Sequence, residues 1–331
     1  MNPKISVLIP AYNAEKSILA AVWSSLNQNF DGFEVFVYDD GSTDNTRVLL
    51  NGISDSRLRV FAGDQNRGIV HTRNCLLMNT AAPYIAWLDA DDIMLPGRLQ
   101  AQYDFFQKHP EIDVLGGWAE LRNHVVGGGK ESHAGLVKMA GDRDYLETSM
   151  LFRNPFIHSS IMARNFFGEK PLFFDPDYEY TEDYDLFLRC RQQGKRFAVI
   201  QQPVVSYFLP ADDDLNEKES RYAIQKKRER LLTRCFPFTP KDKTALVLCF
   251  LRSNTRLSAE SYHILNEWLF LARKTLENDQ NNKLIGVNAV LLFQRFRLYR
   301  LRLGLLVAVL WLLTQNPVVL FAMLRNRTRV V

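Results

Sequence analysis

The first 115 residues alternate short apolar runs with segments of helical periodicity, and this alternation constrains the fold more than any other feature of the chain. The pattern predicts strands at 5–9, 34–38, 58–61 and 84–88, and helices at 14–29, 43–53, 69–80 and 96–108. Strand–helix repeats at this spacing predict a mostly parallel sheet with helices on both faces. Ligands of such sheets bind beyond the carboxyl ends of the strands, so the residues that follow each strand are the candidates for function.

The remaining sequence is less regular. A helix is expected from Glu182 to Gln193, ended by Gly194, and further helices are expected over 215–280. With 331 residues and 47% apolar content, the chain can bury a large core in one domain with an appendage or in two domains. Its four cysteines are scattered, which is typical of free thiols in a reducing compartment, and the first residues lack the length and cleavage site of a signal peptide. A cytoplasmic location is therefore expected.

The charge is distributed unevenly along the chain. Residues 1–220 hold 21 Lys and Arg against 31 Asp and Glu, whereas residues 221–331 hold 20 against 6. Such a split suggests that the basic part has its own partner, either an anionic membrane or a nucleic acid.

Two apolar runs, 303–313 and 318–324, lie in this basic part and are flanked by arginines. Each is shorter than the roughly 20 residues that span a bilayer, so a pair of helices lying in the interface of an anionic membrane is expected. A buried helical hairpin, an oligomer contact and a true span are the alternatives. Nucleic acid is not expected, because the arginines flank apolar runs instead of alternating with stacking aromatic residues.

Three carboxylates follow the fourth predicted strand within four residues: Asp89, Asp91 and Asp92. Like charges this close repel one another and raise one another's pKa unless a cation or several donors offset them. The pattern therefore predicts a divalent metal held by hard oxygen ligands, and such a metal usually holds phosphates in turn. The alternative is a polar turn in which one Asp, such as Asp92, caps the next helix, and this accounts for one carboxylate only.

The second predicted strand ends in Asp39 and Asp40. Ser42 or Thr43 is expected to cap the following helix, and Asp44 suits its positive end. Asp39 and Asp40 are left to accept hydrogen bonds from a base N–H or a ribose hydroxyl.

After the third strand, Asn66 and Arg67 place amide and cationic donors on the same rim, and Arg73 follows on a helix. These donors suit a diphosphate. For Arg73, a solvated position on the helix surface is the alternative.

A third acidic site, Thr181 to Asp185, lies far along the chain. Asp183 is a candidate general base that could take a proton from a substrate hydroxyl, and Glu182 is the second choice. Alternatively, these are ordinary residues at a helix N-terminus.

Taken in order, residues 9–13, 39–44, 66–68, 89–92 and 181–183 resemble the family 2 glycosyltransferases, which have the Rossmann-like GT-A fold. The resemblance covers roughly residues 3–210. It implies an enzyme that transfers a sugar from a nucleotide diphosphate donor, commonly UDP-linked, with inversion at the anomeric carbon. It also implies a GT-A domain over 1–214, with a nucleotide-binding half at about 1–115 and an acceptor half at about 116–214. From the residues themselves, a helical region is expected over 215–331, and its tail from about 284 is expected to associate with the membrane.

The resemblance also implies a role for each candidate residue. Pro10, Ala11 and Tyr12 would line the nucleotide together with Asn66 and Arg67, Asp40 (or Asp39) would contact the uracil, Asp89 would lie near the ribose and the metal, Asp91 would bind Mn²⁺ or Mg²⁺, and Asp183 would be the base. The metal would offset the charge that develops on the leaving diphosphate. Residues 154–160 are similar to a family segment near the acceptor, so His158 joins Glu182 and Asp92 as a candidate there; a packed or solvated His is the alternative.

Processive synthases of the family carry Gln-x-x-Arg-Trp well after the base, together with several membrane spans. Here residues 193–197 read Gln-Gly-Lys-Arg-Phe only ten residues after Asp183, so an enzyme that adds a single sugar is expected. Its expected acceptor is a saccharide or lipid-linked saccharide of bacterial surface polysaccharide assembly, at the inner face of the cell membrane.

Two other classes of protein are the alternatives to a glycosyltransferase. A sugar-1-phosphate nucleotidyltransferase needs a Gly-rich loop after the first strand, where this chain has residues 10–13, Pro-Ala-Tyr-Asn. A non-catalytic, membrane-attached carbohydrate-binding protein would not need the carboxylates of Asp40, Asp89, Asp91 and Asp183.

Overall fold

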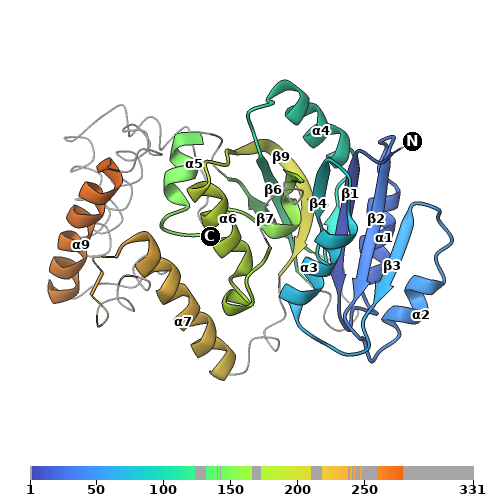
Figure 1. The fold of residues 1–331 in the computed structure, drawn as a ribbon, viewed down its shortest axis with the longest axis horizontal. Helices are drawn as coiled ribbons and strands as arrows, with labels where there is room; N and C mark the ends of the chain where they lie inside the picture. The colour runs from blue at the N-terminus through green and yellow to red at the C-terminus, as the bar shows by residue number, and fades with distance from the viewer. Residues whose placement is uncertain are drawn as a thin grey trace. The chain divides into compact units, whose positions relative to one another are not determined.

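The computed structural model describes residues 2–123, 132–139, 141, 143–165, 173–209, 218–237, 239, 240, 242, 247 and 259–278. The described residues form two compact units (Figure 1). The first contains the described parts of 2–139 and 156–209, and the second those of 141–155 and 218–278. The second unit thus includes residues 141–155, which the sequence placed in the acceptor half.

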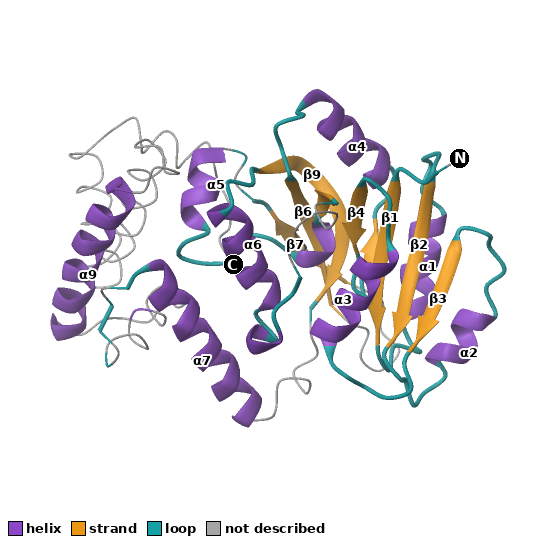
Figure 2. Cartoon of the chain, in the orientation of Figure 1, coloured by secondary structure: helices purple, strands orange, loops and turns teal. Residues whose placement is uncertain are grey.

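The first unit begins with four parallel strands connected by helices. They are β1 (Ile5–Ala11), α1 (Ile18–Leu26), β2 (Phe33–Asp39), α2 (Thr46–Asn51), β3 (Leu58–Ala62), α3 (Ile69–Asn79) and β4 (Tyr84–Trp87). The strands lie in the order β3-β2-β1-β4. Because the chain steps one way from β1 to β3 and then returns to the other side of β1, right-handed crossovers place α3 on the face opposite α1 and α2. Figure 2 shows α3 in front of the sheet and α1 behind it, so the predicted strand–helix repeat is confirmed.

The same sheet continues beyond β4 with mixed strand directions. Its further elements are β5 (Ile93–Met94), α4 (Arg98–Lys108), β6 (Val114–Asn123), β7 (Ser132–Val137), the 3-10 helix η1 (His158–Ser160), β8 (Met162–Arg164), the 3-10 helix η2 (Pro176–Tyr178), α6 (Glu182–Gln192) and β9 (Phe197–Phe208). The strand order is β4-β8-β6-β9-β5, and β7 pairs with β6. β8 runs antiparallel to both β4 and β6, whereas β9 is parallel to β6 and antiparallel to β5. The fold is α/β, as predicted.

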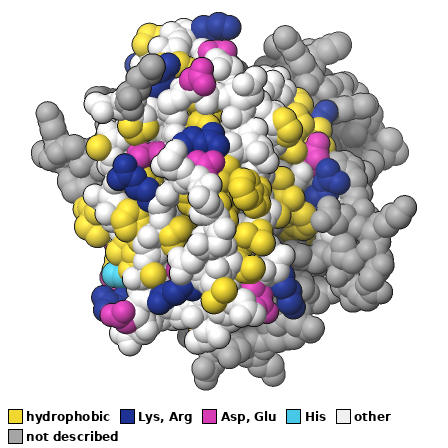
Figure 3. All heavy atoms as spheres, turned by 90° about the vertical axis from the view of Figure 1, so that its right-hand side faces the viewer, with side chains coloured by type: hydrophobic (Ala, Val, Ile, Leu, Met, Phe, Trp, Pro, Cys, Tyr) yellow, Lys and Arg dark blue, Asp and Glu magenta, His cyan; other side chains and the backbone are white. Residues whose placement is uncertain are grey.

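Burial explains which runs became central strands. All residues of β1 and β4 are buried, as expected for parallel strands covered on both faces. β3 is the edge strand and is only partly buried. Its arginine Arg59 and the neighbouring Arg57 lie over the rings of Phe36 and Phe33 and pair with acidic side chains. Figure 3 shows that side of the molecule, with basic and acidic side chains next to one another; charge at a sheet edge discourages pairing with another chain.

The second unit contains α5 (Arg143–Ser149), α7 (Lys218–Cys235) and α9 (Ala259–Asn278), which bears out the expectation of helices after residue 215. Phe152, Phe236 and Trp268 pack against one another, and the indole N–H of Trp268 donates to Thr239 Oγ1 at 2.9 Å. Among the helices that the structure describes, none is both long and apolar enough to cross a bilayer. The predicted membrane tail from about 284, with both apolar runs, lies outside the described residues.

Candidate active site

The carboxyl ends of the first four strands bring the predicted site residues to one edge of the sheet. The order of strands reverses between β1 and β4, where open α/β sheets form their ligand crevice. Pro10 and Ala11 end β1 beside Tyr38 and Asp39 of β2. Pro10 and Ala11 are buried in the sheet, while 44% of the Tyr12 side chain is exposed. Tyr12 is therefore the one of these three that can lie against a bound ring.

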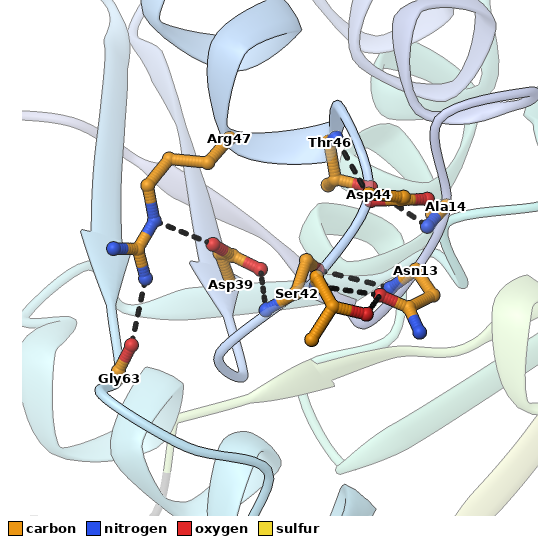
Figure 4. A network of polar contacts seen from close by, with 9 residues as sticks. Asn13, Ala14, Asp39, Ser42, Asp44, Thr46, Arg47 and Gly63 are labelled. Carbon is orange, nitrogen blue, oxygen red and sulfur yellow. Dashed lines mark hydrogen bonds and ion pairs between the residues drawn. The ribbon is translucent and has the colours of Figure 1, made fainter.

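The loops after β1 and β2 are joined to each other by side chains (Figure 4). Asn13, in the left-handed region at φ 48°, accepts through Oδ1 from the backbone N–H of Thr43 at 2.8 Å. Its own N–H donates to Ser42 Oγ at 2.9 Å. The prediction that Ser42 or Thr43 caps the next helix is therefore wrong, because both are taken by a loop about 30 residues earlier in the chain, and Asn45 precedes α2.

Asp44 lies at the N-terminus of α2, as expected. Its Oδ1 accepts from Thr46 N–H at 2.9 Å and its Oδ2 from Glu15 N–H at 3.0 Å. Although the little burial it has would raise its pKa, these hydrogen bonds lower the pKa of Asp44 below the ordinary value.

Asp39 and Asp40 are both buried but have different partners. Asp39 accepts from Ser42 N–H at 3.0 Å and from Arg47 Nε at 2.9 Å, and Arg47 also donates to Gly63 O at 2.7 Å (Figure 4). Both oxygens of Asp39 are thus satisfied, by Ser42 in the loop after β2 and by Arg47, which also contacts the residue after β3. Asp40 uses Oδ2 alone, whereas its Oδ1 is buried with no partner among the described residues. An unpaired buried acceptor is costly, so Asp40 is the better candidate for contact with a ligand N–H.

The loop after β3 begins α3 and is held by Asp40. The backbone N–H groups of Arg67 and Gly68 donate to Asp40 Oδ2 at 3.0 and 2.8 Å. Asn66 accepts from Gly68 N–H at 2.9 Å, and the side chains of Asn66 and Arg67 are exposed at this rim. Gly41 allows the loops to approach, since its φ is +71° and a Cβ would lie 2.5 Å from the Gln65 backbone.

The carboxylates after β4 occupy three different environments. Asp89 receives a hydrogen bond on Oδ1 from Arg73 Nη2 at 3.0 Å, and its N–H donates to Ser159 Oγ at 3.0 Å. Burial would raise the pKa of Asp89, but the charge of Arg73 and the other groups around this carboxylate, the hydrogen bonds from Arg73 and Ser159 among them, together lower that pKa. Asp91 is exposed.

Asp92 is buried and accepts through Oδ1 from Phe208 N–H at 3.0 Å. Its Oδ2 has no partner among the described residues. Burial, then the charges of Asp89 and Asp91, raise the pKa of Asp92 to about 8. The alternative in which Asp92 caps a helix is wrong: Gly97 precedes α4, and Asp92 instead binds the end of β9.

The sequence offered two positions for Arg73, in solvent or at the rim of the site, and the structure shows neither. It is buried, and its guanidinium donates to Glu182 Oε1 and to Asp89 Oδ1. Burial alone would lower the pKa of Arg73, but Asp89, Glu182 and Asp183 raise it. One cation thus joins the end of β4 to the start of α6, although 109 residues separate Arg73 from Glu182.

Glu182 and Asp183 differ in exposure at the start of α6. Glu182 is buried against Arg73, and burial raises its pKa despite the arginine. Asp183 is half-buried, and its Oδ1 accepts from the N–H of Tyr184 at 2.7 Å. Of the two, Asp183 has the more accessible carboxylate.

His158 is packed inside the first unit. Its ring lies 5.1 Å from the Trp87 ring and 5.8 Å from the Phe174 ring, and neither ring nitrogen has a hydrogen-bond partner among the described residues. Burial, and next the charge of Arg73, lower the pKa of His158 well below its ordinary value, which leaves it neutral. His158 is therefore a packed histidine, which was one of the two alternatives to a role near the acceptor.

Arg98 and Ser159 also lie at this site; the sequence did not point to Arg98, and it offered Ser159 only as part of the segment 154–160. Arg98 is fully buried and donates to the carbonyls of Ser159, Trp87 and Ile161 at 2.6, 3.0 and 3.1 Å. Burial lowers the pKa of Arg98 to about 9. A single Arg at the start of a predicted helix is usually solvated, so only its position next to the triple-Asp turn could have drawn attention to it.

The donor set after β4 fits a hard divalent cation only in part. Asp89 and Asp91 offer carboxylate oxygens from one turn, and their charges, after burial, contribute to the raised pKa of Asp92. Within the described ranges, no three His, Cys, Asp or Glu side chains are arranged to enclose an ion. Phosphate and water would have to complete the coordination.

Comparison with known proteins agrees with this geometry. The model of the family described as glycosyl transferase family 2 matches residues 6–173. An uncharacterized glycosyltransferase of Haemophilus influenzae is 30% identical over 239 residues, which are 69% of this chain and 73% of that protein. WfgD of Escherichia coli, a UDP-Glc:alpha-D-GlcNAc-diphosphoundecaprenol beta-1,3-glucosyltransferase, is 33% identical over 124 residues, which are 38% of this chain and 49% of that protein.

The fold is similar to that of S. aureus TarS 1-349, solved in complex with UDP-GlcNAc. The TM-score is 0.58, and the likeness covers 95% of this chain and 93% of that chain at 18% sequence identity, which concerns the fold alone. The predicted GT-A fold and the predicted enzyme class are confirmed. The family match extends over half of the chain and includes the ends of β1, β2, β3 and β4, and the chain belongs to glycosyl transferase family 2.

Proposed function

We propose that this glycosyltransferase moves a sugar from a UDP-linked donor to a hydroxyl of a lipid-linked saccharide, with inversion and with the help of a divalent metal. The observation that carries the proposal is the double contact of Arg73. This buried guanidinium binds Asp89 after β4 and Glu182 at the start of α6. Asp183, the next residue, therefore lies at the same edge of the sheet as Asp89 and Asp91, as a donor site with a separate base requires.

The nucleotide would lie across the ends of β1 and β2. Tyr12 offers an exposed ring, and Asp40 offers the unpaired Oδ1 that could accept from the uracil N–H. The exposed side chains of Asn66 and Arg67 offer donors to the diphosphate from the start of α3. Pro10 and Ala11 would form the backbone wall, and Asp39 would support it through Ser42 and Arg47.

Asp183 would remove the proton of the acceptor hydroxyl as its oxygen attacks the anomeric carbon. The bond from that carbon to the diphosphate breaks on the opposite face, so the configuration inverts and the protein needs no nucleophile. Asp91, with Asp89 beside it, would hold Mn²⁺ or Mg²⁺. Such an ion would supply a positive charge that stabilises the leaving diphosphate.

The acceptor class rests on the relatives and on the composition of the tail. WfgD is named for a glucosyl donor and an acceptor linked to diphosphoundecaprenol. Residues 284–331 of this chain carry seven basic and no acidic side chains around their apolar runs. We propose that they lie on the anionic inner face of the cell membrane, where a lipid-linked saccharide would be met.

The test uses the purified full chain with a panel of nucleotide sugars, assayed with Mn²⁺, with Mg²⁺ and with a chelator. Transfer is expected from a UDP-sugar in the presence of metal, and strong loss of transfer in Asp91→Asn and Asp183→Asn. Asp31→Asn is the matched control, because Asp31 is exposed and lies before β2, at the opposite end of the strands. Full metal-dependent activity of Asp91→Asn would contradict the metal role, and full activity of Asp183→Asn would contradict the base.

Membrane association has its own test. The full chain should sediment with vesicles that contain anionic lipid, and a chain that lacks residues 284–331 should not. Equal sedimentation of both chains would contradict the role proposed for the tail.

A further inference from the structure

The residues that lead into α6 and carry the proposed base form a segment with little regular structure. This base segment, residues 173–183, contains only the short helix η2 before α6 begins at Glu182. Asp183 lies in the first turn of α6, so its position depends on the packing of α6 and on the side-chain contacts that hold the segment before it.

Asn74 of α3 forms two hydrogen bonds with the base segment. Its Nδ2 donates to Phe174 O at 2.9 Å, and its Oδ1 accepts from Phe174 N–H at 2.9 Å. A side-chain amide thus satisfies both polar groups of one residue's backbone, which fixes the position and the orientation of that backbone. A carboxylate lacks the donor and an aliphatic side chain lacks both groups.

Two other residues of the same helix region contact the base segment. Arg73 donates to Glu182. At the start of α3, a Cβ on Gly68 would lie 2.6 Å from Glu179 Oε1, so the backbone of Gly68 packs closely against that carboxylate. The contacts at 174, 179 and 182 attach the base segment along α3.

The N-terminus of α3 is fixed to the nucleotide side of the site. Arg67 and Gly68 donate to Asp40, the proposed uracil contact. A single helix therefore joins the nucleotide loop to the base segment.

We propose that Asn74 is a positioning residue: by holding the Phe174 backbone against α3, it sets the distance between the base Asp183 and the donor bound at Asp40 and Asp91. This inference rests on the proposed function. Asn74 acts through the base segment and needs no contact with substrate.

The segment has a second tether that should preserve the fold when Asn74 is lost. Arg189 of α6 donates to Phe173 O at 2.7 Å and to Asp185 Oδ2 at 2.7 Å. The ring of Phe174 is also buried, 5.5 Å from the Trp87 ring. Loss of Asn74 should therefore loosen the backbone of the base segment relative to α3 without unfolding α6.

The test is a double-mutant cycle of Asn74→Ala with Asp183→Asn, measured as kcat, donor KM and affinity for UDP. In the parent background, Asn74→Ala should lower kcat about 10- to 100-fold, because a small misplacement of a catalytic group has effects of this size. Donor KM and UDP affinity should stay within about twofold. In the Asp183→Asn background the same change should lower kcat less than about threefold, because a misplaced base costs nothing once the base is gone.

Asn79→Ala is the matched control. Asn79 lies on the same helix, donates to Cys75 O within it and is exposed, so kcat should not change. If Asn74→Ala does not fold, Asn74→Asp takes its place, since it keeps an oxygen for Phe174 N–H and loses the donor to Phe174 O.

Three results would overturn the inference. They are an unchanged kcat in a folded Asn74 variant, an equal loss of kcat in both backgrounds, and a loss that appears in UDP affinity instead of kcat. Full activity of Asp183→Asn alone would instead overturn the base assignment of the proposed function, and with it the route through Asp183.

Discussion

The turns after β2 and β4 both place several carboxylates at a strand end, but they satisfy them differently. After β2, Asp39 and Asp44 each have donors on both oxygens, from backbone N–H groups or Arg47, and Asp40 has donors on one oxygen. After β4, Asp92 keeps one oxygen without a partner among the described residues, and its pKa is raised to about 8. Carboxylates with donors on both oxygens stabilise the loop after β2, whereas the three carboxylates after β4, one of them with an oxygen that lacks a partner among the described residues, are suited to bind a cation.

Arginines sharpen the contrast. Arg47 forms an ion pair with Asp39, with Nε 2.9 Å from Oδ2. On the β4 side, Arg73 is shared between Asp89 and Glu182, and Arg98 donates to carbonyls. Two arginines therefore lie near the turn after β4, but only Arg73 forms an ion pair with one of its carboxylates, Asp89.

The largest expected effect comes from removing Arg98. Arg98→Met should lower the free energy of unfolding by about 3–5 kcal/mol, because it leaves buried carbonyls without this donor and removes a buried cation that interacts with Asp92. Chemical denaturation followed by circular dichroism measures it. A loss below about 1 kcal/mol would mean that water replaces the guanidinium.

Asp91→Asn should have the next largest effect, on activity alone. We expect kcat to fall about 100- to 1000-fold, or about 3–4 kcal/mol in the barrier, because stabilisation of the leaving diphosphate is lost. The melting temperature should not fall, since Asp91 is exposed. Asp44→Asn is the control in the other turn and should lower stability more than turnover.

The parallel half of the fold could be predicted from sequence, because its information is local. β1 to β4 are continuous apolar runs and the helices between them show clear periodicity, so each element could be assigned from about ten neighbouring residues. The helices are shorter than predicted, since Ala14 and Glu15 donate to Thr46 and Asp44, and Thr43 donates to Asn13, instead of extending α1 or α2.

The other half depends on contacts between distant residues. β6 pairs with β9 across about 85 residues, and positions 116 and 117 there leave no room for a Cβ because Phe156 and Val204 lie against them. Likewise, Arg73 could be placed on a helix but not next to Glu182. The candidate carboxylates were therefore predictable as positions after strands, while the partners that separate Asp39 from Asp40 were not.

Single substitutions of Asp39 and of Asp40 should affect different properties, the stability of the fold in one case and the binding of UDP in the other. Asp39→Asn should lower the free energy of unfolding by about 1–3 kcal/mol, because the buried charge-assisted bond to Arg47 is lost. Asp40→Asn should instead weaken UDP binding about tenfold, since its amide would present a donor to the uracil N–H. Calorimetric titration with UDP and thermal melting of both variants measure the two effects, and a weaker affinity in Asp39→Asn alone would reverse the two roles.

The smallest expected effect is on the pH dependence of stability of the metal-free protein. Asp92 has a pKa of about 8 in the folded chain against an ordinary value of 3.8, so between these values the folded chain keeps a proton that the unfolded chain has lost. The free energy of unfolding should therefore fall as pH rises from 5 to 8, by about 1–3 kcal/mol from this group. Asp92→Asn keeps an oxygen for Phe208 N–H and cannot ionise, so its stability should change less over that range and match or exceed the parent at pH 8. Denaturation curves at several pH values in the presence of a chelator measure the slope, and equal slopes in the two proteins would place the surplus charge of the β4 turn on Asp89 and Asp91 alone.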